Sequence, residues 1–247
     1  MAKRILRPMG YRDILDETFD LYKRNFFLFA GIACITQTTL GVLRYFIITP
    51  TVRNSPHVWD NYDWFALINL PLLEILVATV TWAASGCYTR EKPTIYDSYK
   101  AVFSKIVPLL LTSVLALIMT IIGTMLFCIP GIAMLVLSVF ITPVILFEGK
   151  AYFAAISRGF QLFRYGWVRI VVLGVLTMVI GLTAWYFIRI PFHFLDPVTR
   201  AHPFRFINYN YGIISMIGEI VSGTLIQPIS IASTLLYYDF RVRKEGF

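Results

Sequence analysis

Charged residues are scarce in this chain of 247 residues: Asp, Glu, Lys and Arg make up 15%, whereas hydrophobic residues make up 57%. A soluble domain has about 25% charged residues, so this composition leaves too little polar surface to cover a water-soluble globule. No long polar stretch interrupts the apolar runs either. We therefore expect one all-α integral membrane domain over residues 1–247 and no soluble module.

Cysteine is also rare, and its placement excludes two classes of small protein. Cys34, Cys87 and Cys128 lie inside or beside apolar segments and form no CxxC or Cys/His spacing. This pattern predicts neither a disulfide framework nor a metal site. An acidic amphipathic stretch follows the basic residues 1–7, so we also expect no cleavable signal peptide.

Catalytic patterns are missing as well. The sequence has no Ser/His/Asp order, no glycine-rich phosphate loop and no close carboxylate pair in an accessible place. We therefore predict a non-enzymatic protein without cofactor, metal or catalytic residues. The net charge of +8 does not indicate nucleic-acid binding, because Lys and Arg lie between apolar runs, as they do in membrane proteins.

Six apolar runs come close to or exceed the roughly 20 residues that a membrane helix needs. Between the third and fourth runs, Pro130 and Gly131 predict a tight hairpin rather than one very long helix. The six predicted spans are Phe26–Thr49, Trp64–Cys87, Ile106–Cys128, Gly131–Phe147, Trp167–Ile190 and Gly212–Tyr237.

Basic residues predict how these spans are oriented. They are concentrated before the first span, between the second and third, between the fourth and fifth, and after the sixth. The alternate loops hold only Arg53, Arg200 and Arg205. Since basic residues favour the cytoplasmic side, both termini are predicted to lie in the cytoplasm, with the protein in the plasma (inner) membrane.

Three cytoplasmic segments have helical amphipathic spacing and lead directly into a span. These are the residues before Phe26, Thr94–Lys105 and Ala151–Tyr165. We expect interfacial helices that lie on the membrane. They divide the chain into three units of one interfacial helix and two spans, covering about residues 10–88, 93–148 and 151–240.

The first and third units also match in detail: Phe19-Asp20-Leu21-Tyr22-Lys23 corresponds to Phe160-Gln161-Leu162-Phe163-Arg164. An internal repeat is a common way to build a membrane fold. The alternative is that any cytoplasmic helix entering a membrane is amphipathic and rich in aromatic residues.

Three stretches resemble a known family: GYRDILDETFDLYKRNF (10–26), EGKAYFAAISRGFQLFRYGW (148–167) and LLYYDFRVRKEGF (235–247). They are similar to the bacterial glycerophosphoryl diester phosphodiesterase membrane-domain family and related uncharacterised membrane proteins. The resemblance implies a membrane domain. It implies no phosphodiesterase activity, because nothing in the chain resembles the metal-binding Glu and Asp motifs of the catalytic domain.

Polar residues within the predicted spans are candidates for function, since they are costly in a bilayer. Glu74 and Glu219 could form a polar site that handles a proton or a cationic group, or they could pair with Arg44 and Arg189 to hold helices together. Gln227, beside Pro228, could line a cavity or connect two helices.

Basic residues at the predicted inner face suggest a surface for anionic lipid, formed by Lys23, Arg24, Arg158 and Arg164. The leading hypothesis is a protein that organises lipid or a membrane partner. The partners expected are the bilayer and a protein partner or a second copy, with no nucleic acid. The alternative hypothesis is a small-molecule or lipid transporter or channel that uses Glu74 and Glu219.

Overall fold

The computed structural model describes residues 8–54, 60–89, 91–126, 131, 134, 137–195 and 213–245; within helices it describes only the backbone of 44–54, of 60–69 and of parts of 165–195 and 213–245. All the regular structure in these ranges is helical, which confirms the all-α prediction. The helices are α1 (Tyr11–Arg24), α2 (Phe26–Asn54), α3 (Asp60–Tyr88), α4 (Ile95–Phe103), α5 (Ile106–Leu126), α7 (Ile141–Pro143), the π-helix η1 (Val144–Glu148), α8 (Tyr152–Leu195) and α10 (Ile213–Glu245).

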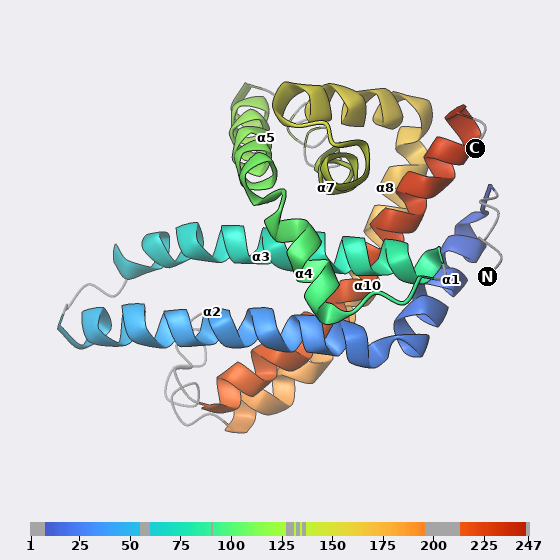
Figure 1. The fold of residues 1–247 in the computed structure, drawn as a ribbon. Coiled ribbons are helices and arrows are strands. Elements are labelled where there is room, and N and C mark those ends of the chain that lie inside the picture. Colours follow the sequence, from blue (N-terminus) through green and yellow to red (C-terminus); the bar gives the residue numbers. More distant parts are fainter. Residues whose placement is uncertain are drawn as a thin grey trace.

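Helix α10 is the centre of the arrangement (Figure 1). It contacts α8 along much of its length and also contacts α1, α2 and α3. Helices α2 and α3 lie side by side, and α1 contacts α10 at one end of the described structure (Figure 1). The buried hydrophobic core follows α10, where Leu235, Tyr237 and Phe240 are at most 1% exposed.

Among the described residues, three helical segments are long and apolar enough to cross a membrane: Phe26–Leu43, Leu70–Tyr88 and Ile106–Leu126. They coincide with the first three predicted spans. The segment in α5 is 17% buried, and residues such as Leu111, Ile121 and Met125 are exposed along it. Exposed apolar surface on this scale is unusual for a soluble protein and fits contact with lipid. The other three spans remain a prediction.

A short helix, a break and a long helix follow one another three times. Asn25 separates α1 from α2, and residues 104–105 separate α4 from α5. In α8 the break is Gly166, whose φ of −158° and ψ of 46° are not helical. The first part of α8 crosses the top of Figure 1, and the second part turns down beside α10. All three breaks fall directly before a predicted span.

Local sequence explains these breaks. Asn25 ends α1 with its amide nitrogen and side chain both donating to the Leu21 carbonyl, and its own carbonyl accepts from Leu28 and Phe29 at the start of α2. At Gly166 a Cβ atom would lie 2.7 Å from Cε1 of Phe240, so the close approach of α10 requires glycine. Thr94 caps the start of α4, where its hydroxyl accepts from the Asp97 amide at 3.1 Å.

The apolar face of α1 is covered by protein. Ile14, Thr18, Leu21 and Tyr22 are buried, and the helix contacts α10, α2 and α3. This differs from the expectation of a helix lying on the membrane. Helical periodicity identifies an apolar face, but it does not reveal whether lipid or another helix covers that face.

The chain doubles back after α5. A Cβ atom at Gly131 would lie 2.7 Å from the Cα of Thr124, so these two residues are in contact. Seven residues of continuous helix would separate them by about 10 Å. A single helix through this region is therefore excluded. Beyond it, α7 passes into η1, which ends at Gly149 with a left-handed φ of 66°.

Candidate functional site

Glu74 lines a cavity of about 470 Å³ between α3, α5, α7 and α10. Helix α3 places it there, four residues after Leu70 and beside Pro71, and the opposite walls include Ala116 of α5 and Ser230 of α10. Among the described residues of the lining, Glu74 is the one with an ionisable side chain. Sequence analysis identified this residue as a candidate, and the structure places it in the lining of the cavity.

The polar partners of Glu74 are neutral hydroxyl groups. Thr142 of α7 donates to Glu74 Oε1 at 2.8 Å, and Ser113 of α5 also hydrogen-bonds the carboxyl group. Further hydroxyls line the same cavity, and the complete set is Ser113, Thr120, Ser138, Thr142, Ser230 and Ser233. A carboxyl group surrounded by hydroxyls can bind a ligand that donates hydrogen bonds.

The rim of the cavity is apolar and exposed. Leu70 of α3 is 47% exposed, and Val114 and Leu117 of α5 are 53% and 43% exposed. These side chains belong to helices that are apolar enough to span a membrane. A molecule with an apolar tail could therefore leave its polar end in the cavity and extend its tail past this rim.

Gln227 does not line this cavity. It is 3% exposed, and its Nε2 donates to the Phe29 carbonyl at 2.9 Å, so it connects α10 to α2. Its Oε1 is buried and has no hydrogen-bond partner among the described residues. Of the two predicted roles, the contact matches the connection between helices.

Pro228 has a structural consequence one turn earlier. Proline has no amide hydrogen, so the carbonyl of Thr224 loses its usual helical donor. The hydroxyl of Tyr22 in α1 donates to that carbonyl at 3.0 Å. Burial raises the pKa of Tyr22 to about 12, so the hydroxyl keeps its hydrogen at neutral pH.

Three other predicted site residues lie outside the described side chains. Arg44 of α2, Arg189 of α8 and Glu219 of α10 have described helical backbone only. Their predicted pairing with Glu74, or with one another, stays a prediction.

The four predicted lipid-binding residues differ in their surroundings. Lys23 and Arg164 are exposed, and Arg24 is exposed while it pairs with Asp20 at 3.3 Å. Arg158 is 12% exposed and pairs with Glu148 at 2.9 Å. Arg158 is therefore engaged within the protein, whereas Lys23, Arg24 and Arg164 are exposed, and Arg24 shares its charge with Asp20.

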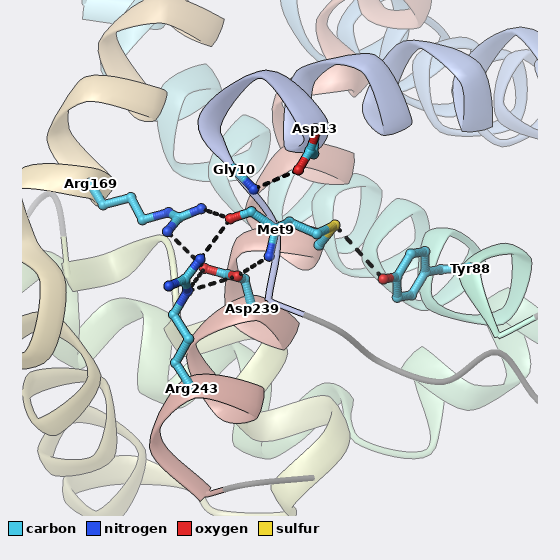
Figure 2. A network of polar contacts seen from close by, with 7 residues as sticks. All are labelled: Met9, Gly10, Asp13, Tyr88, Arg169, Asp239 and Arg243. Atoms are coloured by element: carbon cyan, nitrogen blue, oxygen red, sulfur yellow. Dashed lines mark hydrogen bonds and ion pairs between the residues drawn. The ribbon is translucent and has the colours of Figure 1, made fainter.

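A second polar group of residues, not identified from the sequence, lies where the chain ends meet (Figure 2). Asp239 is 0% exposed, yet it pairs with Arg169 of α8 at 3.4 Å and with Arg243, one turn further along α10, at 3.0 Å. It also accepts a hydrogen bond of 2.7 Å from the amide of Met9. Both arginines donate to the Met9 carbonyl, Arg243 at 2.8 Å.

This arrangement, here called the Asp239 network, comprises Met9, Arg169, Asp239 and Arg243. It fastens the segment before α1 to α8 and α10. Asp239 belongs to LLYYDFRVRKEGF (235–247), one of the three stretches that carry the family resemblance. Its position in the sequence, however, gave no sign that Asp239 contacts a residue 230 positions away.

Glu148 forms a neighbouring group at the end of η1. Its carboxylate accepts from Arg158 at 2.9 and 3.0 Å and from the Tyr237 hydroxyl at 3.1 Å, and it pairs with Lys150 at 3.0 Å. Burial opposes ionisation, but the hydrogen bonds from Lys150 and Arg158 and the Arg158 charge outweigh it and lower the pKa of Glu148.

Among the described residues, no group of three or more His, Cys, Asp and Glu side chains could hold a metal ion. No protein-family model, curated protein sequence or solved structure matches this chain. Its function must therefore be argued from the cavity and the helices around it.

Proposed function

We propose that this protein is a non-enzymatic, six-span membrane protein that binds a lipid or lipid-like molecule in the Glu74 cavity. The observation that carries the proposal is that Glu74 is the one ionisable side chain in the described lining of a cavity of about 470 Å³, with exposed apolar residues at its rim. Ligand sites are typically cavities of about 300–1,000 Å³ with a few polar groups in apolar walls.

The fold supports this proposal in two further ways. Met9 and Asp239 are hydrogen-bonded, so both ends of the described chain lie on the same side, as an even number of spans requires. The distribution of basic residues favours the cytoplasm for that side. The resemblance to the glycerophosphoryl diester phosphodiesterase membrane-domain family agrees with a membrane protein.

The first test compares two substitutions on the exposed face of α5. Val114 lines the cavity, whereas Ile118, one turn further on, does not, and the two are 53% and 47% exposed. Val114→Trp should obstruct the cavity, and Ile118→Trp adds the same side chain outside it. Each variant and the unaltered chain would be extracted gently with native membrane and examined by native mass spectrometry.

We expect a co-purified lipid on the unaltered chain and on Ile118→Trp, and its loss from Val114→Trp. Equal lipid retention by both variants would show that the cavity is not the site. A chain that emerges without lipid in all three samples would also contradict the proposal.

Transport is the second candidate function, favoured by an ionisable group in a cavity formed by predicted spans. Lipid organisation requires only that a ligand binds, whereas transport requires that the ligand crosses the membrane. Flux of a bound amphiphile in reconstituted vesicles, abolished by Glu74→Gln, would favour transport. Binding without flux would favour the organising role.

A further inference from the structure

The charge of the cavity restricts the ligands that it can hold. Its described lining contains Glu74 and no basic residue. Three nearby basic side chains are bound elsewhere: Lys105 donates to the Leu146 carbonyl at 2.6 Å, Arg158 pairs with Glu148, and Arg243 of α10 pairs with Asp239. A phosphate or carboxylate head group would meet a carboxyl group without a described cation to balance it. Anionic ligands are therefore disfavoured.

The carboxyl and hydroxyl groups that line the cavity can accept hydrogen bonds from a ligand that donates them. Thr142 occupies one position on Glu74 Oε1, and a carboxylate has about four acceptor sites on its two oxygens. An ammonium group has three N–H donors and no acceptor. It could donate to Glu74 and to nearby serine hydroxyls such as Ser230. A hydrogen bond between two charged groups is stronger than one between neutral groups.

The rim suits an apolar tail. Leu70, Val114 and Leu117 are exposed apolar side chains at the edge of the cavity, on helices that are apolar enough to span a membrane. A single alkyl chain could follow them into the hydrocarbon, where burial of each CH₂ is favourable.

From these observations, and resting on the proposed function, we infer that the cavity selects an amphiphile with a cationic amine head, which Glu74 binds. Anionic and neutral amphiphiles of the same length bind more weakly.

Three probes with one tail test the inference: dodecylamine, 1-dodecanol and dodecanoic acid. Each is titrated at about neutral pH, where an alkylamine is protonated, against the full-length chain in detergent, and native mass spectrometry counts the bound molecules. Dodecylamine should bind about tenfold more tightly than dodecanol, and dodecanoate should bind most weakly. In Glu74→Gln the amine and the alcohol should bind equally.

Val114→Trp separates this inference from the proposed function. If Val114→Trp weakens all three probes but the unaltered chain binds amine and alcohol equally, the cavity is a binding site and the selectivity for amines is wrong. If Val114→Trp weakens none of them, the proposed function itself fails. Retention of amine preference in Glu74→Gln would also overturn the inference. The three probes on the unaltered chain need no substitution, so this result stands even if Glu74→Gln does not fold.

Discussion

Two carboxyl groups lie in apolar surroundings in this molecule, and their partners differ. Asp239 is fully buried and bound by two arginines and the Met9 amide, so its charge is balanced within the protein. Glu74 is bound by the neutral hydroxyls of Thr142 and Ser113 and faces a cavity. The comparison suggests that the two carboxyl groups have different roles. Asp239, whose charge is balanced by arginines, stabilises the fold, and Glu74, which has no described cationic partner, is available to a ligand.

The strongest test of this difference in roles removes the carboxylate of Asp239. Asp239→Ala leaves Arg169, which is 13% exposed, without its carboxylate partner, and it leaves the Met9 amide without an acceptor. Breaking a buried ion pair in this way costs about 3–5 kcal/mol. We expect a correspondingly large fall in the free energy of unfolding, or loss of folded protein, measured by thermal unfolding in detergent.

Asp16→Ala is the control for that experiment. Asp16 pairs with Arg12 at 3.5 Å, but the two side chains are 71% and 91% exposed. Exposed pairs of this kind contribute about 0–1 kcal/mol. Equal destabilisation by Asp16→Ala and Asp239→Ala would contradict the stabilising role of the Asp239 network.

Glu148 provides an intermediate case, because it is 10% exposed and its charge is balanced by Arg158. Its pKa is lowered in the folded chain, so the stability it adds is fully present above its unfolded pKa, near 4.5, and is lost as pH falls through the folded pKa. We expect Glu148→Gln to cost about 1–3 kcal/mol at neutral pH. Between about pH 6 and about pH 3, the free energy of unfolding should fall less steeply with pH in Glu148→Gln than in the unaltered chain. Parallel pH curves for the two chains would refute this role.

The smallest expected effect concerns the carbonyl that Pro228 leaves without a donor. Tyr22→Phe removes the hydroxyl that donates to the Thr224 carbonyl, and it should lower the free energy of unfolding by about 1 kcal/mol. In a Pro228→Ala background the restored amide can bind Thr224, so the same substitution should cost less than about 0.5 kcal/mol. A double-mutant cycle measures this difference.

Tyr99→Phe is the matched control for the cycle. Its hydroxyl donates to the Ile32 carbonyl at 3.0 Å, far from Pro228 in the chain. It should cost the same in both backgrounds. If Tyr22→Phe lowered the free energy of unfolding equally in the unaltered and the Pro228→Ala backgrounds, the hydroxyl of Tyr22 would not be compensating for the amide that Pro228 lacks.

Much of the helical pattern could be predicted because it depends on local chemistry. Three of the six predicted spans begin at Phe26, Ile106 and Trp167, and the structure has a helical segment beginning at each of these residues. The second was predicted to begin at Trp64, whereas α3 begins at Asp60. Long apolar runs and a capping threonine act within a few residues. These features are therefore visible in a sequence without knowledge of the tertiary fold.

The candidate sites could be predicted only in part. The depth of Glu74 in an apolar run indicated a functional or structural role, but its partner Thr142 lies 68 positions away on another helix. Asp239 lies in a stretch that resembles a known family, and Arg158 was a candidate for lipid binding, but the sequence did not reveal the partner of either residue. In each case the partner depends on how the helices pack, which hydropathy alone does not specify.

The position of the Asp239 network also determines when the fold can be completed during synthesis. Met9 precedes α1 and Tyr22 lies in α1, the earliest of the described helices to be made, but both bind residues of α10, which is made after all the other described helices. Until α10 is inserted, the amide of Met9 lacks its acceptor, and α1 can pack only against α2 and α3. A nascent chain arrested before Asp239 would therefore contain most of the described helices and still lack the contact that joins its beginning to the rest, which makes it a natural substrate for membrane quality control.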